Sequence, residues 1–410
     1  MKLTKIEIKG LFDLFDYEIP LINEENLLII TGPNGFGKTM ILNIIDSFFN
    51  NRLDFFQKLI FEYITIYTDN NLQIEIAKYS DNGNDDVNIE IIENKTILAT
   101  LTHSSLKSDL LKSLSEKVRE SSLVKQIKDS NIQFYKQLFS ISGSLKVHLI
   151  KEQRLIKRES IKNLEFANAH FDFGMDENDY IIDTIEGSAI ELKDLLNRYL
   201  QTSYTTTQQI DSSFPKRLLN EKGTLSINEF DKKFKSLKEK IEKLKRFGLS
   251  ESEQEIPEYD EKNASVLLVY LKDSEEKISV FNGLLSRLEL FTGTLNERRF
   301  TFKSIKIDKN KGFIFLTKND VELKLTDLSS GEQHEVVLLY ELIFKTNPNT
   351  LVLIDEPEIS LHVTWQKEFL SDLLKILELQ KMQVIVATHS PQIINDRWDL
   401  VFNLETQMIQ

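Results

Sequence analysis

One short segment of the chain combines glycines, a lysine and a hydroxyl group at the spacing that binds phosphate. Residues 32–39, the phosphate loop, match Gly-x-x-x-x-Gly-Lys-Thr, a pattern in which backbone N–H groups surround a polyphosphate. Glycines let the backbone approach the phosphates without a Cβ clash, and the following helix adds the positive end of its dipole. The sequence therefore predicts an ATP site formed by Gly32, Pro33, Asn34, Gly35, Phe36, Gly37, Lys38 and Thr39.

Two side chains of this loop and two distant carboxylates could together carry out metal-assisted hydrolysis. Lys38 should reach the β- and γ-phosphates, and the Thr39 hydroxyl should bind Mg²⁺. Asp355 and Glu356 directly follow the apolar run 351–354, and a buried strand delivers its last residues to the ligand edge of an α/β sheet. We predict that Asp355 holds the Mg²⁺ shell and that Glu356 is the general base that activates the attacking water.

The elements that must position these residues alternate between strands and helices. The apolar run 27–30 predicts a covered strand directly before the phosphate loop, and a helix opens at Met40. Short β runs separated by hairpin turn signals predict antiparallel strands between residues 61 and 102. Further strands are expected over 3–9, 301–307 and 312–317, and a helix is expected over 105–140.

The middle of the chain, 189–297, has helical periodicity. Apolar residues are spaced 3, 4, 3, 4, 3 from Ile227 to Leu244 and 3, 4, 3 from Ile278 to Leu288, which predicts a short antiparallel arm with a coiled-coil seam. Its first helix carries eight Lys/Arg against three Asp/Glu over 231–246. This charge fits either a solvated helix face or a contact with a partner or nucleic acid.

Composition narrows the classes of protein. The 410 residues carry a net charge of −13, which argues against wholesale coating of nucleic acid or anionic membrane. No apolar run reaches the roughly 18 residues that span a bilayer, and the N-terminus lacks a signal-peptide core, so we expect a cytoplasmic protein without membrane contact. The chain has no Cys, and its six His show no metal-ligand pairing, which argues against disulfides and a zinc site.

A third motif resembles the signature sequence of a known protein family. Residues 328–333, the signature loop, read Leu-Ser-Ser-Gly-Glu-Gln and resemble the signature of ABC ATPases in its non-transporter form, as in the overcoming-lysogenization-defect and defence ATPases. The resemblance implies that Ser329 binds the γ-phosphate held by another subunit, with Ser330, Gly331 and Glu332 completing the loop. Ser330 stands where the family usually has the first of two glycines.

Three further segments match the same family. Gln153 follows the apolar run 147–150 and resembles the Q-loop glutamine, which would complete Mg²⁺ coordination and sense the water. Ser360 lies in the segment 358–362, which resembles the D-loop at the dimer seam. His389, between Thr388 and Ser390, resembles the switch histidine that contacts the γ-phosphate. The segment 207–219 is also frequent in this branch, without a physical role that we can derive.

The resemblance implies the α/β fold of an ABC ATPase head, with a mixed sheet bearing the phosphate loop, an antiparallel β subdomain and a helical or short coiled-coil insertion. We expect the N-terminal part of the head over 1–188, the arm over 189–299 and the C-terminal part of the head over 300–410. One chain then has two phosphate-seeking sites, so the family arrangement implies a head-to-tail homodimer that holds each ATP between two chains. A higher oligomer stays open.

Gln153 and Ser329 lie 329 − 153 = 176 residues apart, which favours relatives of chromosome-maintenance and break-repair ATPases over a transporter subunit. The chain ends 410 − 389 = 21 residues past His389, too few for the nuclease domain of overcoming-lysogenization-defect nucleases. We therefore expect the sensor or regulator ATPase of a two-component antiphage system, similar to those of the Septu and PARIS systems, with the effector nuclease on a separate chain. The alternatives are a DNA-repair ATPase that clamps DNA, and a transporter or translation-factor ATPase. DNA or RNA contact stays open.

Overall fold

The computed structural model describes residues 1–81, 84–103, 122–152, 156–160, 179–250, 258–298, 300, 302–359 and 361–407. They form two compact units. The first unit combines both ends of the chain, Met1–Gln153 and Lys345–Gln410, and the second is Arg154–Phe344. Within the described ranges, none of the helices combines the length and the apolar character needed to cross a membrane.

A parallel five-stranded sheet carries the phosphate loop in the first unit. Its order is β16-β3-β15-β14-β8, and all four neighbouring pairs are parallel. The central strands β14 and β15 are completely buried, which the apolar run 351–354 predicted for β14. The strands are β3 (Leu27–Thr31), β8 (Lys146–Ile150), β14 (Thr350–Asp355), β15 (Gln383–Ala387) and β16 (Val401–Asn403).

The second sheet of this unit is antiparallel and has the order β2-β1-β4-β5-β6-β7. It contains the antiparallel strands that the sequence predicted between 61 and 102, and within β1 the side chains of Leu3, Ile6, Ile8 and Leu11 are buried. The strands are β1 (Leu3–Leu11), β2 (Phe15–Pro20), β4 (Tyr63–Thr68), β5 (Leu72–Asp81), β6 (Asn84–Glu93) and β7 (Thr96–His103). Parallel and antiparallel strands thus occupy two separate sheets, and the phosphate loop is carried by a parallel sheet instead of the expected mixed one.

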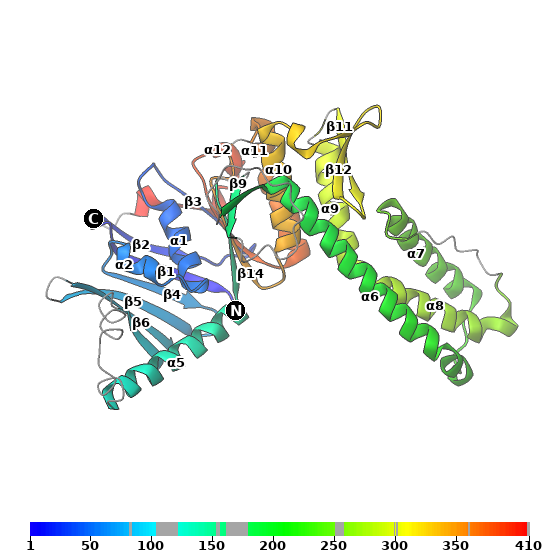
Figure 1. The fold of residues 1–410 in the computed structure, drawn as a ribbon, viewed down its shortest axis with the longest axis horizontal. Helices are drawn as coiled ribbons and strands as arrows, with labels where there is room; N and C mark the ends of the chain where they lie inside the picture. Colours follow the sequence, from blue (N-terminus) through cyan, green and yellow to red (C-terminus); the bar gives the residue numbers. More distant parts are fainter. Residues whose placement is uncertain are drawn as a thin grey trace. The chain divides into compact units, whose positions relative to one another are not determined.

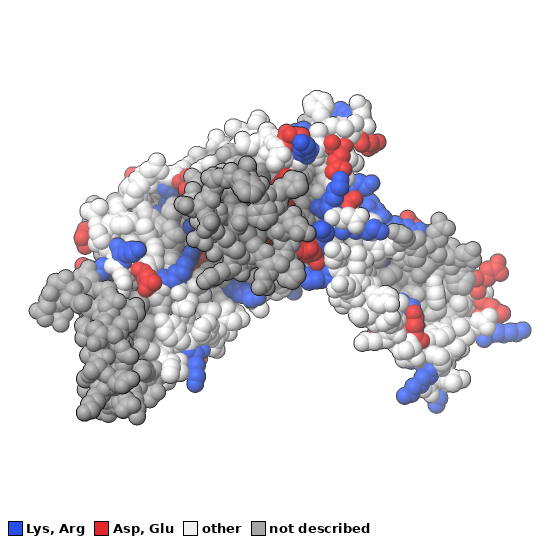
Figure 2. Space-filling model, in the orientation of Figure 1, with Lys and Arg blue, Asp and Glu red and all other residues white. Residues whose placement is uncertain are grey.

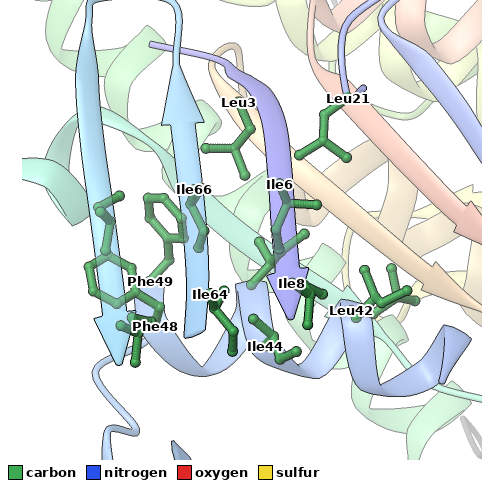
Figure 3. Packing of buried hydrophobic residues seen from close by; sticks show 14 of the residues in the cluster. Leu3, Ile6, Ile8, Leu21, Leu42, Ile44, Phe48, Phe49, Ile64 and Ile66 are labelled. Atoms are coloured by element: carbon green, nitrogen blue, oxygen red, sulfur yellow. The ribbon is translucent and has the colours of Figure 1, made fainter. Parts of the chain in front are cut away.

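Helix α1 (Lys38–Phe49) fixes the phosphate loop in this framework because it packs on both sheets and contributes to their common core. Figure 3 shows Phe48 and Phe49 of α1 facing Ile64 and Ile66 of β4, while Leu42 lies near Ile8. Full burial of one such side chain is worth about 2 kcal/mol. Among the described residues of this unit, the other α-helices are α2 (Asp54–Lys58), α5 (Ser122–Ser144), α11 (Val363–Gln380) and α12 (Pro391–Ile394).

The second unit is built around a long helix, α6 (Thr184–Asn220), which runs through much of the unit in Figure 1. The three-stranded sheet β11-β12-β13 packs on it, and Gly312 allows the close approach, since a Cβ there would lie 1.9 Å from the Ala189 carbonyl oxygen. The strands are β9 (Ile156–Ser160), β10 (Asp179–Asp183), β11 (Lys303–Asp308), β12 (Gly312–Thr317) and β13 (Glu322–Leu323).

The arm does not form the predicted coiled coil of two helices. Helix α7 (Ile227–Arg246) buries its apolar stripe as expected. However, the second apolar repeat is divided between α8 (Ala264–Ser279) and α9 (Asn282–Arg298). The break falls at residues 280 and 281, and α9 then opens with Asn282 and Gly283, two poor helix formers. Helix α8 packs on both α6 and α7, so the arm is a helical bundle rather than a seam between two helices.

The two compact units meet at residues 153/154 and 344/345, whereas the sequence analysis placed the boundaries after residues 188 and 299. Residue 188 lies inside α6, and β11 and β12 pack on α9 and α6. The segment 207–219 also lies within α6, where Arg217 forms an ion pair with the buried Asp273 of α8. Its structural part is therefore to join two helices of the bundle.

Candidate functional site

The phosphate loop connects β3 to α1 with glycines in conformations that other residues rarely adopt. Gly35 and Gly37 have φ values of 89° and 84°, in the left-handed region that favours glycine. A Cβ on Gly37 would also lie 3.0 Å from Leu11 Cδ2. Among the described residues no side chain caps α1, and its first turn contains no acidic residue. Its amide donors are therefore oriented for an anion.

Lys38 is buried, with 5% of its surface exposed, and its ammonium group has three partners. It donates hydrogen bonds to the carbonyl oxygens of Gly32 (2.8 Å) and Pro33 (3.2 Å), and Nζ lies 3.2 Å from His389 Nδ1. Burial lowers the pKa of Lys38, and the negative charges of Glu356, Asp355 and Glu358 oppose that shift. A triphosphate would replace these partners with stronger, charge-assisted ones.

His389 connects the lysine to the predicted base. Because an ammonium group only donates, Nδ1 of His389 accepts from Lys38, and Nε2 carries the proton of the neutral ring. That nitrogen lies 3.2 Å from Glu356 Oε1. Glu356 itself has φ = 43°, an uncommon conformation for a residue other than glycine, and its N–H donates to the Ala387 carbonyl oxygen at 2.8 Å. The ends of β14 and β15 therefore hold Glu356 and His389 side by side.

Thr39 and Asp355 meet as the sequence predicted. The Thr39 hydroxyl donates to Asp355 Oδ1 at 3.1 Å, and Asp355 is only 2% exposed. Burial raises the pKa of Asp355 to about 6, and the nearby carboxylates Glu152 and Glu356 add to the shift while the Thr39 hydrogen bond opposes it. A divalent cation beside this carboxylate would favour its ionised form and so oppose the effect of burial on its pKa.

The donor set fits Mg²⁺. A hydroxyl and a carboxylate oxygen are the hard ligands that this ion prefers, and in nucleotide sites it takes one or two carboxylates together with substrate phosphates and water. In the described ranges there is no group of three or more acidic or His side chains that could cage a metal. We therefore assign Thr39 and Asp355 as candidate ligands of a nucleotide-bound ion. Gln153, the third predicted ligand, lies outside the described residues.

Replacing Asp355 with Asn should stabilise the nucleotide-free protein. The folded-state pKa of Asp355 is raised from 3.8 to about 6, so its ionisation destabilises the folded protein. This destabilisation increases as the pH rises from 3.8 to about 6 and reaches its full value above about pH 6. The gain for Asp355→Asn should approach ~3 kcal/mol at pH 8 and be smaller at pH 5. Thermal melting at both pH values checks this. An Asn variant that melts at or below the wild-type temperature at pH 8 would contradict the raised pKa of Asp355.

The signature loop lies in the second unit, at the start of α10 (Ser330–Tyr340). Ser329 caps this helix, and Glu332 closes a capping box by accepting from Ser329 N (2.8 Å) and Oγ (3.0 Å). Lys303 of β11 donates to both Glu332 oxygens, at 2.8 and 2.7 Å. Burial opposes ionisation of Glu332, but the hydrogen bonds from Lys303 and Ser329 outweigh it and lower its pKa.

Ser329 and Ser330 are exposed, as a contact with another chain would require. Their relation to a phosphate loop, in the same or another chain, stays a prediction. Ser360, predicted for the dimer seam, lies outside the described residues, although the neighbouring Glu358, Ile359 and Leu361 are within them.

Three residues near the site were not predicted from the sequence. Tyr17 of β2 donates its hydroxyl to the Phe36 carbonyl oxygen at 2.9 Å and so supports the phosphate loop. Glu152 lies near Asp355. Glu358 accepts three hydrogen bonds from the loop that carries His389. No spacing rule identifies any of them, because each acts through a contact between distant parts of the chain.

The fold and this site define a P-loop ATPase head of mixed α/β architecture with parallel and antiparallel sheets and a helical insertion, which confirms the predicted fold class. The chain belongs to the AAA ATPase domain family, whose model matches residues 1–394.

Two curated relatives are similar over short stretches. The chain is 32% identical over 103 residues to the Retron Ec83 probable ATPase of Escherichia coli, which covers 22% of this chain and 19% of the relative. It is 30% identical over 113 residues to Protein ea59 of Escherichia phage lambda, covering 27% and 21%. The matches thus span about a fifth of the length of each relative.

Among solved structures, the Smc head domain from Pyrococcus furiosus, with an extended coiled coil and bound to the C-terminal domain of ScpA, matches 98% of this chain and 92% of that chain, at 14% identity and a TM-score of 0.41. The SMC head domain from Thermotoga maritima matches 98% and 94%, at 14% identity and a TM-score of 0.34.

Proposed function

We propose that this chain hydrolyses ATP as an ABC-type head-to-tail dimer. The observation that carries the proposal is the meeting of the phosphate loop with the ends of β14 and β15. There the Thr39 hydroxyl lies 3.1 Å from Asp355 Oδ1, while His389 lies 3.2 Å from both Lys38 Nζ and Glu356 Oε1. These groups come from positions up to 351 residues apart in the sequence, so their convergence is a property of the fold.

Each group has a separate part in the proposed reaction. Lys38 would transfer its hydrogen bonds from loop carbonyls to the β- and γ-phosphates. Glu356 would take a proton from the attacking water, and His389 would fix the Glu356 carboxylate and then face the γ-phosphate. Mg²⁺, when bound at Thr39 and Asp355, would neutralise charge that develops on the phosphate oxygens.

The dimer is supported by the second anion-seeking feature of the chain. The 11-residue helix α10 has the exposed residues Ser329 and Ser330 at its N-terminus, and helix N-termini favour anions. An ATP bound in the phosphate loop of one chain would then be closed by Ser329 of a second copy. ATP would favour this closed dimer because only there does it contact both chains, and hydrolysis would remove the difference in affinity.

Ser329→Arg should abolish ATP-driven dimerisation while leaving the monomer folded, since an exposed arginine adds bulk at the proposed interface without disturbing a core. Sedimentation in ATP, in the Glu356→Gln background that prevents turnover, measures this. Ser226→Arg is the matched control, because Ser226 caps α7 with the same Ser–Glu box and faces no proposed nucleotide. A normal ATP-dependent dimer of the Ser329 variant would contradict the sandwich.

We further propose that the ATPase is the regulatory component of a bacterial antiphage-defence system whose effector nuclease is a separate chain. The likeness to a retron ATPase supports this assignment, as does the resemblance of the signature loop to defence ATPases. Proteins that copurify with the Glu356→Gln variant test it, because ATP should hold that variant in one state. Recovery of a nuclease is expected, and recovery of a membrane permease would instead favour transport.

A DNA clamp is the second candidate, and the specific observation in its favour is the basic helix α7. Lys232, Lys235 and Lys238 are exposed on it, while Lys243 and Arg246 pair with Glu289. Figure 2 shows basic and acidic side chains interspersed over the visible described surface, a pattern typical of a solvated face. DNA affinity that falls steeply with salt would favour the clamp.

A further inference from the structure

One carboxylate oxygen accepts hydrogen bonds from all three residues of the segment 388–390, the switch loop. Oε1 of Glu358 accepts hydrogen bonds from the Thr388 hydroxyl (2.7 Å), the His389 N–H (2.8 Å) and the Ser390 N–H (3.1 Å). Hydrogen bonds to an ionised acceptor are roughly twice as strong as neutral ones. This loop has no regular secondary structure. The Thr388 N–H donates to the Ile30 carbonyl oxygen at 3.1 Å, whereas the His389 and Ser390 N–H groups donate to Glu358.

The same network reaches the chain that follows Glu358. Gln366 of α11 donates to the carbonyl oxygens of Glu358 (3.3 Å) and Leu361 (3.1 Å) and accepts from the Ser390 hydroxyl at 2.9 Å. Gln366 thereby ties the turn after β14 to the switch loop. Gln366 therefore positions the turn at Glu358 and the switch loop at Ser390 together.

The loop that Glu358 holds carries a side chain with two functional contacts. His389 Nδ1 lies 3.2 Å from Lys38 Nζ, and Nε2 lies 3.2 Å from Glu356 Oε1. Hydrogen bonds of this length weaken steeply when an atom moves by 1 Å. Any rotation of the 388–390 backbone would displace the ring from at least one of its two partners.

We infer that Glu358 is a positioning residue, whose carboxylate holds the switch loop so that His389 stands between Lys38 and Glu356. It acts through the loop backbone and does not itself need to touch the nucleotide. The inference rests on the proposed function, since it gives His389 and Glu356 their parts in ATP hydrolysis. The second oxygen of Glu358 is buried and has no hydrogen-bond partner in the described part of the chain, so the holding contacts come from Oε1.

The test compares Glu358→Ala with Glu358→Gln, because the amide oxygen of Gln can still accept the three hydrogen bonds. Glu378→Ala, which removes an exposed carboxylate of α11, is the control. For each variant, hydrogen–deuterium exchange over residues 387–392, ATP turnover, ATP affinity and thermal melting are measured.

For Glu358→Ala we expect exchange at the His389 and Ser390 amides to accelerate about 10-fold or more, as bonded amides become open to water. The kcat should fall roughly 10- to 100-fold, with KM for ATP and the melting temperature almost unchanged. Glu358→Gln should restore protection and most of the kcat, and Glu378→Ala should match the wild type.

Unchanged exchange in Glu358→Ala would overturn the inference, and so would faster exchange with an unaltered kcat. A loss of activity that parallels a loss of melting temperature, without rescue by Gln, would show a merely structural role and also overturn it. Failure of the proposed function is distinguishable, because the wild-type chain would then hydrolyse no ATP, while the exchange comparison would still report whether Glu358 holds the loop.

Discussion

Lys38→Ala should weaken ATP binding by roughly 100-fold or more, because it removes charge-assisted hydrogen bonds worth about 1.5–3 kcal/mol each. The ammonium group is buried beside the phosphate loop, where three acceptors already orient it. In that water-poor setting, neither solvent nor another described side chain can take its place on the phosphates. Equilibrium titration with a fluorescent ATP analogue in the presence of Mg²⁺ measures the loss.

The control for this variant is Lys58→Ala, which removes an exposed lysine from α2 of the same unit. Its ATP affinity should match that of the wild type, which separates loss of the specific contact from loss of net charge. Lys38→Ala should also leave the unit folded, since the hydrogen bonds that it removes go to carbonyl oxygens of the phosphate loop and not to the hydrophobic core. Undiminished ATP affinity in Lys38→Ala would reject the phosphate-binding part assigned to this residue.

Glu356→Gln should reduce kcat by about 10²- to 10⁴-fold, the usual contribution of a general base, while ATP binding is retained. Glutamine has nearly the same shape, can occupy the left-handed conformation no less readily than Glu356, and can still accept a hydrogen bond from His389 Nε2 at the observed 3.2 Å. It cannot take a proton from water. Single-turnover hydrolysis and ATP affinity, measured on the same preparation, separate chemistry from binding.

Glu378→Gln, on the exposed side of α11, is the matched control and should hydrolyse ATP at the wild-type rate. If Glu356→Gln also turns over ATP at the normal rate, the base lies elsewhere. Glu152 would then be the next carboxylate to examine, because it lies close enough to Asp355 to raise the pKa of that residue.

Much of the site could be predicted from the sequence because short segments contain the residue types and spacing that its chemistry requires. The glycines and Lys38 of the phosphate loop follow from the backbone shape that an enclosed polyphosphate requires. Asp355 and His389 could be placed nearby because each follows a wholly apolar run, and parallel buried strands end at one edge. Their observed contacts with Thr39 and Lys38 bear out that reasoning.

The remainder depends on tertiary contacts without a sequence signal. Glu358 follows the base by two residues, yet nothing local shows that it receives three hydrogen bonds from a loop some 30 residues further along the chain. The arm was misjudged for a related reason. Heptad spacing predicts an apolar face but not the partner that covers it, and α8 contributes its face to both α6 and α7.

Mixing two inactive variants tests the central claim, that ATP is hydrolysed between the phosphate loop of one chain and the signature loop of another. Lys38→Ala and Ser329→Arg should each be inactive alone, but a mixed dimer joins the intact phosphate loop of one variant to the intact signature loop of the other. Because one of the two nucleotide sites of such a mixed dimer is intact, the account predicts that the 1:1 mixture hydrolyses ATP faster than the sum of the two variants assayed alone. A mixture that hydrolyses ATP no faster than the sum of its two components would contradict the account.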